Sequence, residues 1–192
     1  DNSGLMWIGT YSGVSIFNPN SSFIHFKSEM EDDTINSNLI QGIYEDQDGT
    51  FWIGSNESGV NVLNKNSVKY LNTKNRDLLN DSIRDITGFK NNIYLGTNEG
   101  LSVLTKNDKK GEDYTITNYT EENGLPSNKV RSLYVDSKGY VWIGTNKGLA
   151  TLDPNNNIID ISYIFEKIGV SDKFVRAVYE DSSGNYYIGC FL

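Results

Sequence analysis

The sequence predicts an all-β protein made of β-propeller blades, which are four-stranded antiparallel repeats of about 45 residues, in an incomplete or small ring. One frame recurs along the chain. It reads DSKGYVWIGTNKGLATLDP at residues 136–154, DNSGLMWIGTYSGVSIFNP at 1–19 and, with one extra loop residue, DQDGTFWIGSNESGVNVLNK at 46–65. Its aromatic anchors stand 45, 42, 48 and 45 residues apart, at Trp7, Trp52, Tyr94, Trp142 and Tyr187. Strands and tight turns repeating at this period are typical of propeller blades.

The best-preserved repeat predicts four short strands. Residues 129–135 alternate apolar and polar side chains with one irregular step, and residues 136–139 form a turn in which an Asp caps its own backbone. Residues 140–145 are rich in β-branched and aromatic side chains, as expected of a second strand. A tight hairpin at 146–148 leads to a third strand at 149–152, and residues 158–165 supply part or all of a fourth.

The other copies follow the same order, so we expect one propeller fragment over residues 1–192 with no domain boundary. Further first strands are predicted at 39–44, 82–87 and 174–179, and further fourth strands at 23–26, 68–71 and 114–119. A short helix is expected only at 164–168. The blades therefore span residues around 1–27, 39–71, 82–119, 129–165 and 174–192.

The composition excludes several classes of function. With 17 basic and 25 acidic residues the net charge is −8, which argues against a general binder of nucleic acid or of anionic membranes. No apolar run approaches the roughly 20 residues that span a bilayer. The single Cys190 permits no internal disulfide. Because the chain starts and ends inside a repeat, we interpret it as a fragment, and a membrane would be reached only through missing parts of a parent protein.

The W-I-G-T-x-x-G-L-x-x-x-D-P pattern at 142–154 and the N-x-V-x-x-L-Y-x-D pattern at 128–136 resemble the two-component regulator propeller repeat. Residues 7–19 and 52–64 match nearly as well, whereas 94–105 lacks the Trp and the D-x-x-G turn. The resemblance implies the sensor region of a bacterial hybrid histidine kinase or related regulator. It also implies a periplasmic or extracellular location and a role in sensing a carbohydrate or its breakdown product.

The number of blades leaves open how a ring would close. The chain holds three complete blades, with three strands before them and two after. Residues 174–192 could pair with residues 4–26, or two chains could share a larger ring. Exposed blade edges predict self-association in the second case.

The first strands align Gln41, Arg84, Arg131 and Arg176 at one blade position. In a propeller this strand lines the central channel, so we expect these side chains to converge near its mouth and bind a carboxylate or sulfate of a glycan or other small ligand. The competing interpretation is structural, with each Arg paired to an acid such as Asp85 or Asp172 or to backbone carbonyls between blades. The loops around the same end would join the site, including the hairpin residues Tyr11 and Asn56.

No pattern for catalysis, metal or cofactor binding is strong. The repeated Trp and Gly have a mechanical explanation, since the aromatic ring fills space between blades and Gly allows close backbone approach. The D-x-D-G at Asp46 resembles a calcium loop only superficially, because a strand interrupts it. We therefore expect a non-catalytic binding module without cofactor. The alternatives are a propeller lyase or glycan-cleaving enzyme, for which Tyr11, His25 and Glu29 are the candidates, and a protein–protein scaffold.

Overall fold

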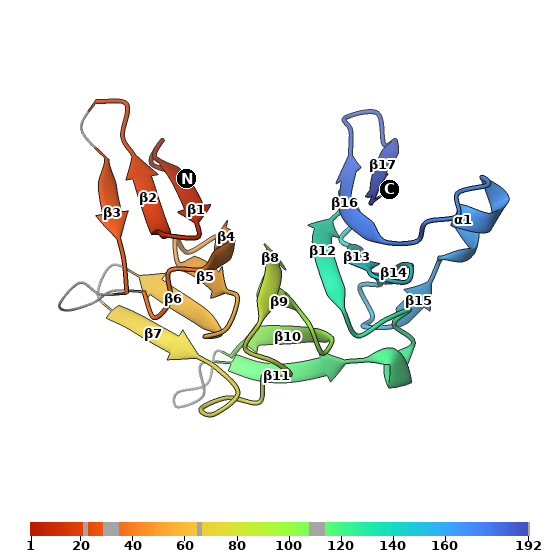
Figure 1. Ribbon diagram of the computed structural model, residues 1–192, viewed down its shortest axis with the longest axis horizontal. Coiled ribbons are helices and arrows are strands. Elements are labelled where there is room, and N and C mark those ends of the chain that lie inside the picture. Colours follow the sequence, from red (N-terminus) through yellow and green to blue (C-terminus); the bar gives the residue numbers. More distant parts are fainter. Residues whose placement is uncertain (21–22, 29–34, 65–66, 108–113, 192) are drawn as a thin grey trace. The chain divides into compact units, whose positions relative to one another are not determined.

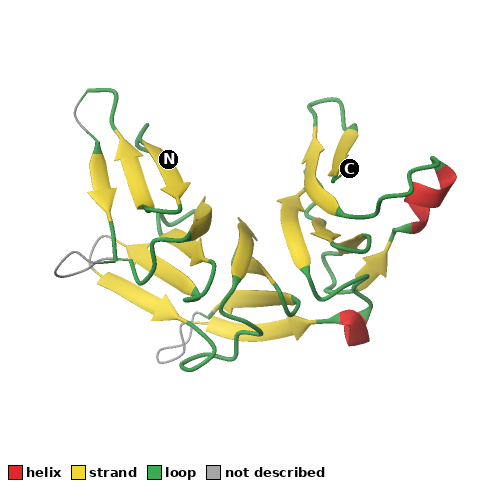
Figure 2. Cartoon of the chain, in the orientation of Figure 1, coloured by secondary structure: helices red, strands yellow, loops and turns green. Residues whose placement is uncertain are grey.

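The computed structural model describes residues 1–20, 23–28, 35–64, 67–107 and 114–191. Its internal contacts define two compact units, Asp1–Ile86 and Thr87–Leu192, and each is described by itself. Strands dominate the described residues, with two short helical segments (Figure 2). None of the described helices has the length and apolar character needed to cross a membrane.

The first unit holds two antiparallel sheets whose strands follow one another along the chain (Figure 1). A three-stranded sheet is formed by β1 (Met6–Thr10), β2 (Gly13–Phe17) and β3 (Ile24–Phe26). A four-stranded sheet follows, with β4 (Ile40–Glu45), β5 (Phe51–Ser55), β6 (Val60–Asn64) and β7 (Ser67–Leu71).

The second unit continues the same succession. Strand β8 (Ile83–Phe89) runs into it from the first unit and forms a sheet with β9 (Asn92–Thr97), β10 (Leu101–Lys106) and β11 (Tyr114–Tyr119). The next sheet contains β12 (Val130–Val135), β13 (Val141–Thr145), β14 (Leu149–Leu152) and β15 (Ile158–Asp160), and a pair formed by β16 (Val175–Glu180) and β17 (Tyr186–Cys190) comes last. The helical segments are η1 (Glu121–Asn123) and α1 (Tyr163–Lys167).

The predicted strands are present with ends shifted by one or two residues, apart from one fourth strand. The prediction of part or all of 158–165 holds only in part, because β15 ends at Asp160 and α1 occupies Tyr163–Lys167. The cause is local: the carboxylate of Asp160 accepts a hydrogen bond from the backbone N–H of Ser162, which turns the chain out of the sheet. Phe165 of α1 is then buried against Leu149 and Val175.

Each D-x-x-G turn is fastened to the aromatic residue of its own second strand. In the best-preserved repeat, Oδ1 of Asp136 accepts from the backbone N–H groups of Lys138 and Tyr140, both at 2.9 Å. Its Oδ2 accepts from the indole Nε1 of Trp142 at 2.9 Å. The same bond joins Asp46 to Trp52 at 2.9 Å, Asp1 to Trp7 at 2.7 Å and, with a phenol as donor, Asp181 to Tyr187 at 3.1 Å. The turn Asp therefore fixes the aromatic ring as well as its own backbone.

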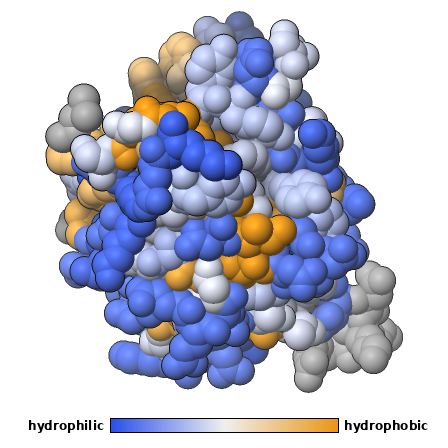
Figure 3. Space-filling view, turned by 90° about the vertical axis from the view of Figure 1, so that its right-hand side faces the viewer, coloured by the Kyte–Doolittle hydropathy of each residue, from blue (hydrophilic) through white to orange (hydrophobic). Residues whose placement is uncertain are grey.

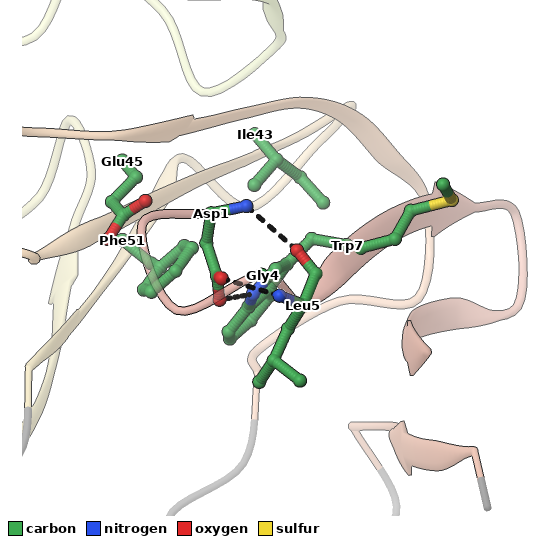
Figure 4. Close-up of a pocket in the computed structure, with 8 residues that line it drawn as sticks. Asp1, Gly4, Leu5, Trp7, Ile43, Glu45 and Phe51 are labelled. Atoms are coloured by element: carbon green, nitrogen blue, oxygen red, sulfur yellow. Dashed lines mark hydrogen bonds between the residues drawn. The ribbon is translucent and has the colours of Figure 1, made fainter. Parts of the chain in front are cut away.

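Three contacts join successive sheets, and the full set occurs once in each unit. We call this set the clasp: two stacked aromatic rings, a Glu that accepts from a backbone N–H group, and a glycine covered by a β-branched side chain. In the first unit Trp7 stacks on Phe51 with ring centroids 3.8 Å apart, and Glu45 accepts from the backbone N–H of Asn2 at 3.0 Å. A hollow of about 510 Å³ lies beside these groups (Figure 4). The third part is Gly9, where an added Cβ would lie 2.7 Å from Ile40.

The second unit repeats this clasp between the β12–β15 sheet and the β16–β17 pair. Trp142 stacks on Tyr186 at 4.3 Å, and Glu180 accepts from the backbone N–H of Ser137 at 2.7 Å. An added Cβ on Gly144 would lie 2.8 Å from Val175. The predicted role of the aromatic ring as filler is thus observed, whereas the glycine makes room for a side chain of the next sheet and not for the close backbone approach that was predicted.

Two further glycines of second strands are covered in the same way as Gly9 and Gly144. Gly54 faces Ile83 and Gly96 faces Val130, so a β-branched residue of the next first strand covers each of these positions. The buried apolar side chains accordingly gather between successive sheets, as in the cluster that contains Leu101, Val130 and Ile143. One face of the molecule is mostly hydrophilic with small apolar patches, in keeping with the net charge of −8 (Figure 3).

Candidate functional site

The predicted site position coincides with a β-bulge in three of the sheets. The register between first and second strands shifts from Val130 to Ser132, which leaves Arg131 as the extra residue. The same shift leaves Gln41 extra in β4 and Arg176 extra in β16. A bulge takes one residue out of the ladder and re-aims its side chain, which is why bulges are frequent beside functional sites.

Arg131 is held by two asparagines from neighbouring sheets. Its Nε donates to Oδ1 of Asn146 at 2.5 Å, and its Nη1 donates to Oδ1 of Asn98 at 3.1 Å. Both asparagines belong to the hairpins between second and third strands, so the half-buried guanidinium bridges two hairpins at one end of the sheets. These hydrogen bonds to neutral amides orient the guanidinium.

Arg176 lies beside Arg131 on a shared aromatic ring. The guanidinium carbons of Arg176 and Arg131 are 4.7 and 5.9 Å from the ring centroid of Phe174. Arg176 also lies 5.6 Å from the centroid of Phe191, which packs at 5.7 Å on Phe174. Arg176 is exposed, and within the described part of the chain it has no carboxylate partner. The two cations and the aromatic pair together form what we call the Arg–Phe cluster, defined as Arg131, Arg176, Phe174 and Phe191.

A polar hollow of about 320 Å³ adjoins this cluster. The two asparagines that hold Arg131 line it, together with acidic, basic and hydroxyl groups of the connector and hairpins: Glu99, Glu121, Ser127, Asn128, Lys129 and Lys147. Ligand pockets start at roughly 300 Å³, so the hollow has room for a group of about one sugar unit. Its mixture of hydrogen-bond donors and acceptors suits a ligand rich in hydroxyl groups.

The first unit carries the remaining predicted residues. Gln41 borders a hollow of about 420 Å³ together with Thr10 and Tyr11, whose side chain is 73% exposed. Arg84 is half-buried on β8. The hairpin residue Asn56 has a buried Oδ1 without a hydrogen-bond partner among the described residues. An unsatisfied buried acceptor is costly, and here it lies at the position that Asn98 and Asn146 occupy in the second unit.

The structure therefore brings together two of the four predicted residues, Arg131 and Arg176, and describes Gln41 and Arg84 in the other unit. One example given for the competing structural interpretation, a pairing of Asp172 with an arginine, is absent from the described residues. The carboxylate of Asp172 accepts from the backbone N–H of Phe174 at 2.7 Å, and no described arginine lies within ion-pair distance of it.

Sequence reasoning missed most of the partners of these arginines. One column of the repeat, directly after the Gly-Thr, Gly-Ser or Gly-Cys of the second strand, reads Tyr11, Asn56, Asn98, Asn146 and Phe191. Tyr11 and Asn56 were predicted to join the site, whereas the other three were missed. Amide or aromatic side chains fill every copy. Aligning this position across the repeats would therefore have predicted the hairpin residues as partners of the arginines, once the arginine position had been identified.

The other candidate sites do not form chemical centres. Both oxygens of Asp46 accept hydrogen bonds from the turn and Trp52, as expected of a structural turn. Nδ1 of His25 lies 2.9 Å from Oγ of Ser15, yet in the described residues no carboxylate completes the pair. Glu29 lies outside the described residues. Burial and the nearby charge of Asp172 raise the pKa of the Cys190 thiol, which disfavours the reactive thiolate.

Two segments of the chain, residues 34–57 and 124–147, match the family described as two component regulator propeller. They contain the WIGS and WIGT repeats on which the resemblance rested, so that prediction is confirmed for these repeats. No curated protein sequence matches the chain.

Several solved structures share the fold. The extracellular domain described for the hybrid two-component system BT3049 of B. thetaiotaomicron is 21% identical and aligns with a TM-score of 0.81 over 99% of this chain and 26% of its own. The corresponding domain of BT4673 from the same organism is 20% identical, with a TM-score of 0.80 over 99% and 27%. Virginiamycin B lyase from Staphylococcus aureus is 15% identical, with a TM-score of 0.71 over 98% and 60%. These likenesses confirm the all-β propeller-blade fold. The chain spans about a quarter of the length of these two extracellular domains.

Proposed function

We propose that the chain is a non-catalytic, ligand-sensing propeller module of a bacterial two-component regulator and that it acts outside the cytoplasm. The matches to the two component regulator propeller and the shared fold with two extracellular domains support this class and location. A sensor of this kind needs a built recognition site, and the bulge-borne arginines supply one.

The proposed ligand is a carbohydrate that carries a carboxylate or sulfate. The observation that carries this assignment is Arg131, held by Asn98 and Asn146 beside the exposed Arg176 and Phe174. A guanidinium pair is suited to an oxyanion, and an aromatic ring packs against the C–H face of a sugar. The adjoining polar hollow would take the hydroxyl groups of the same ligand.

A calorimetric titration with acidic, sulfated and neutral oligosaccharides of equal length tests the proposal. We expect the acidic or sulfated members to bind, and Arg131→Gln and Arg176→Gln combined to abolish that binding while circular dichroism stays unchanged. Lys138→Gln is the matched control, because it removes one exposed positive charge from a turn at the opposite end of the sheets.

Each outcome of this titration either supports or contradicts the proposed site. Undiminished binding by the double variant would remove the site. If the double variant unfolds, the exposed Arg176→Gln alone becomes the test, since its side chain supports no hydrogen bond in the described residues. Binding that Arg176→Gln leaves intact would then assign the arginines to structure.

The enzyme alternative has one supporting observation, the fold shared with virginiamycin B lyase. The described residues offer Ser15 and His25 without a carboxylate, which is an incomplete set for nucleophilic catalysis. Cleavage of any oligosaccharide in the titration panel, followed by mass spectrometry, would favour this alternative.

A further inference from the structure

A hollow of about 820 Å³ lies between the two sheets of the first unit and shares no residue with the Arg–Phe cluster. We call it the junction hollow. Its walls are half-buried apolar side chains from both sheets: Trp7, Phe26, Phe51, Leu63 and Val68. Ligand pockets usually measure roughly 300 to 1,000 Å³ and have mostly apolar walls, so the junction hollow has the size and the walls of a binding site for a small molecule.

The second unit has the same junction, between the β8–β11 and β12–β15 sheets, and there the side chains pack together. The strand registers place Tyr94, Tyr119, Val141, Leu152 and Ile158 at the five wall positions. All five belong to or pack against one apolar cluster, in which Tyr94, Val141 and Leu152 are at most 4% exposed. The two junctions are therefore a matched pair, one packed and one with an open hollow.

Phe89 and Val135 account for the packing in the second unit. Phe89 ends β8, at the position where the other repeats begin the turn with Asp. An added Cβ on Gly139 would lie 2.9 Å from its ring, so Phe89 covers the facing turn. Val135 and Phe89 both pack against the apolar cluster.

The first unit has Asp1 and Glu45 at these two positions. The carboxylate of Asp1 accepts from the indole of Trp7 at 2.7 Å and from backbone N–H groups of its own turn. Gly49, the equivalent of Gly139, has only Oε1 of Glu45 within 4 Å of an added Cβ, at 3.9 Å. A carboxylate thus lies beside the hollow where the second unit has an apolar side chain.

The rim of the junction hollow is acidic. Glu45 and Asp48 line it, whereas the second unit has Val135 and Lys138 at these positions. No Lys or Arg is found among the described residues that line the hollow, and the amino group of Asp1 donates within its own turn at 2.7 Å. A cation is attracted both by carboxylates and by the faces of aromatic rings, and the junction hollow offers both.

We infer that the junction hollow binds a small ligand that joins an ammonium group to an apolar body. The apolar body would lie against the walls and release water from them, and the ammonium group would lie at the rim near Glu45 and Asp48. Such a ligand carries the opposite charge to the carbohydrate of the proposed function. The amine site therefore does not rest on that function, and either can fail alone.

An NMR titration of the full chain tests the amine site by following the three indole N–H signals, of which only that of Trp7 belongs to a wall of the hollow. The probes share one phenylethyl group: phenethylamine, 2-phenylethanol and 3-phenylpropionate. We expect phenethylamine to shift the Trp7 signal and to bind about ten-fold more tightly than the alcohol, with the acid weakest. Added salt should weaken the binding of the amine and leave that of the alcohol unchanged.

Asp48→Lys tests the charge with a residue that this turn accepts. The equivalent turn carries Lys138, whose backbone N–H donates to Asp136 as that of Asp48 donates to Asp46, both at 2.9 Å. We expect Asp48→Lys to weaken phenethylamine binding about ten-fold and to leave 2-phenylethanol binding within about two-fold. Asp48→Asn, which keeps the size of the side chain, should weaken the amine by a smaller factor, and it decides the question if Asp48→Lys does not fold.

Lys138→Asp is the matched control, because it adds the same acid at the packed junction. We expect it to create no additional site for phenethylamine. The combined Arg131→Gln and Arg176→Gln variant should keep the parent's affinity for the amine, which separates this site from the proposed carbohydrate site.

Equal binding of phenethylamine and 2-phenylethanol, or a Trp7 signal that no probe moves, would contradict the amine site. Folded Asp48 variants that keep the parent's affinity for the amine would contradict it as well. A new amine site in Lys138→Asp would show that an added acid suffices without a hollow, which would also overturn the assignment.

Discussion

At the scale of single residues, the turn aspartates have the clearest energetic role. Asp136 is almost fully buried and accepts four hydrogen bonds, including one from Trp142 and one from the hydroxyl of Tyr186 in the next sheet. Asp181 makes the same kind of turn but is half-exposed and has no following sheet packed on it among the described residues. The repeat therefore offers a matched pair of residues that differ mainly in burial.

We predict that Asp136→Asn lowers the free energy of unfolding by about 2 kcal/mol or more, because the amide would put a donor against the half-buried donors of Trp142 and Tyr186. Asp181→Asn should cost clearly less, because water can satisfy its partners. Urea denaturation of both variants measures the difference. Equal losses would contradict the role assigned to burial.

The carboxyl group of Asp136 also makes the stability of the fold depend on pH in the acidic range. Burial raises the pKa of Asp136, but hydrogen bonds from Trp142, Tyr140, Tyr186 and Lys138 lower it more, so the folded pKa lies below the ordinary 3.8. A lowered folded pKa stabilises the fold above the unfolded value, and this contribution is lost as pH falls through the folded value. In Asp136→Asn the part of the acid dependence due to this group should be absent.

The residue types alone predicted the turns and the aromatic packing, but not the hydrogen bonds that connect them. The Asp and Gly of each turn predicted the backbone geometry, and the aromatic period predicted inter-sheet packing. The bond from Asp to the indole was not predicted, because it joins positions six apart that meet only when the first and second strands pair. Tyr187 shows that the function of the position is hydrogen donation to Asp as well as bulk.

At the scale of elements, strand β17 is coupled to the preceding sheet through its first residue. Burial, the hydrogen bond to Asp136 and the negative charges of Asp136 and Glu180 raise the pKa of Tyr186 from 10.0 to about 12. The folded chain thus retains a proton that the unfolded chain loses. A raised folded pKa stabilises the fold below the unfolded value, so this contribution should disappear as pH rises from 10.0 to about 12.

We predict that Tyr186→Phe removes this alkaline loss of stability while lowering stability at neutral pH, because the bond to Asp136 is lost. Chemical denaturation at a series of pH values across that range measures it. Tyr187→Phe is the control on the same strand, since it leaves the contact between Tyr186 and Asp136 in place. A parallel alkaline loss in wild type and Tyr186→Phe would sink the assignment.

The elements also show where sequence reasoning ends. Every predicted first strand is present, and the irregular step anticipated at 129–135 is the bulge at Arg131. The sequence did not show that this step is a bulge, because a bulge is defined by the register with a partner strand. The fourth strand predicted over part or all of 158–165 ends early for two reasons: the turn at Asp160 is a local side-chain contact, and the burial of Phe165 depends on tertiary packing.

At the scale of the whole molecule, the unpaired edge of β1 bears on association. In the first sheet β1 lies at the edge, with Met6 58% and Ile8 37% exposed. Edge strands with apolar side chains favour pairing between chains. We therefore propose that the chain of 21.6 kDa self-associates through this edge.

Light scattering over a concentration series is expected to give a particle mass that rises with concentration. Ile8→Lys should reduce that rise, because a charged side chain on an edge opposes strand pairing. Thr115→Lys, at an exposed position of the edge strand β11, controls for added charge. A mass of one chain at every concentration would contradict the proposal.

The bulge has a consequence for how such a protein can diversify. The bulged residue is the one position of the first strand that the ladder does not constrain, so its exchange leaves the pairing of the sheet intact. One repeat already carries Gln41 where two others carry Arg131 and Arg176. Each repeat can thus change its chemical preference independently, and a chain of repeats can evolve a new recognition pattern one side chain at a time without redesigning its architecture.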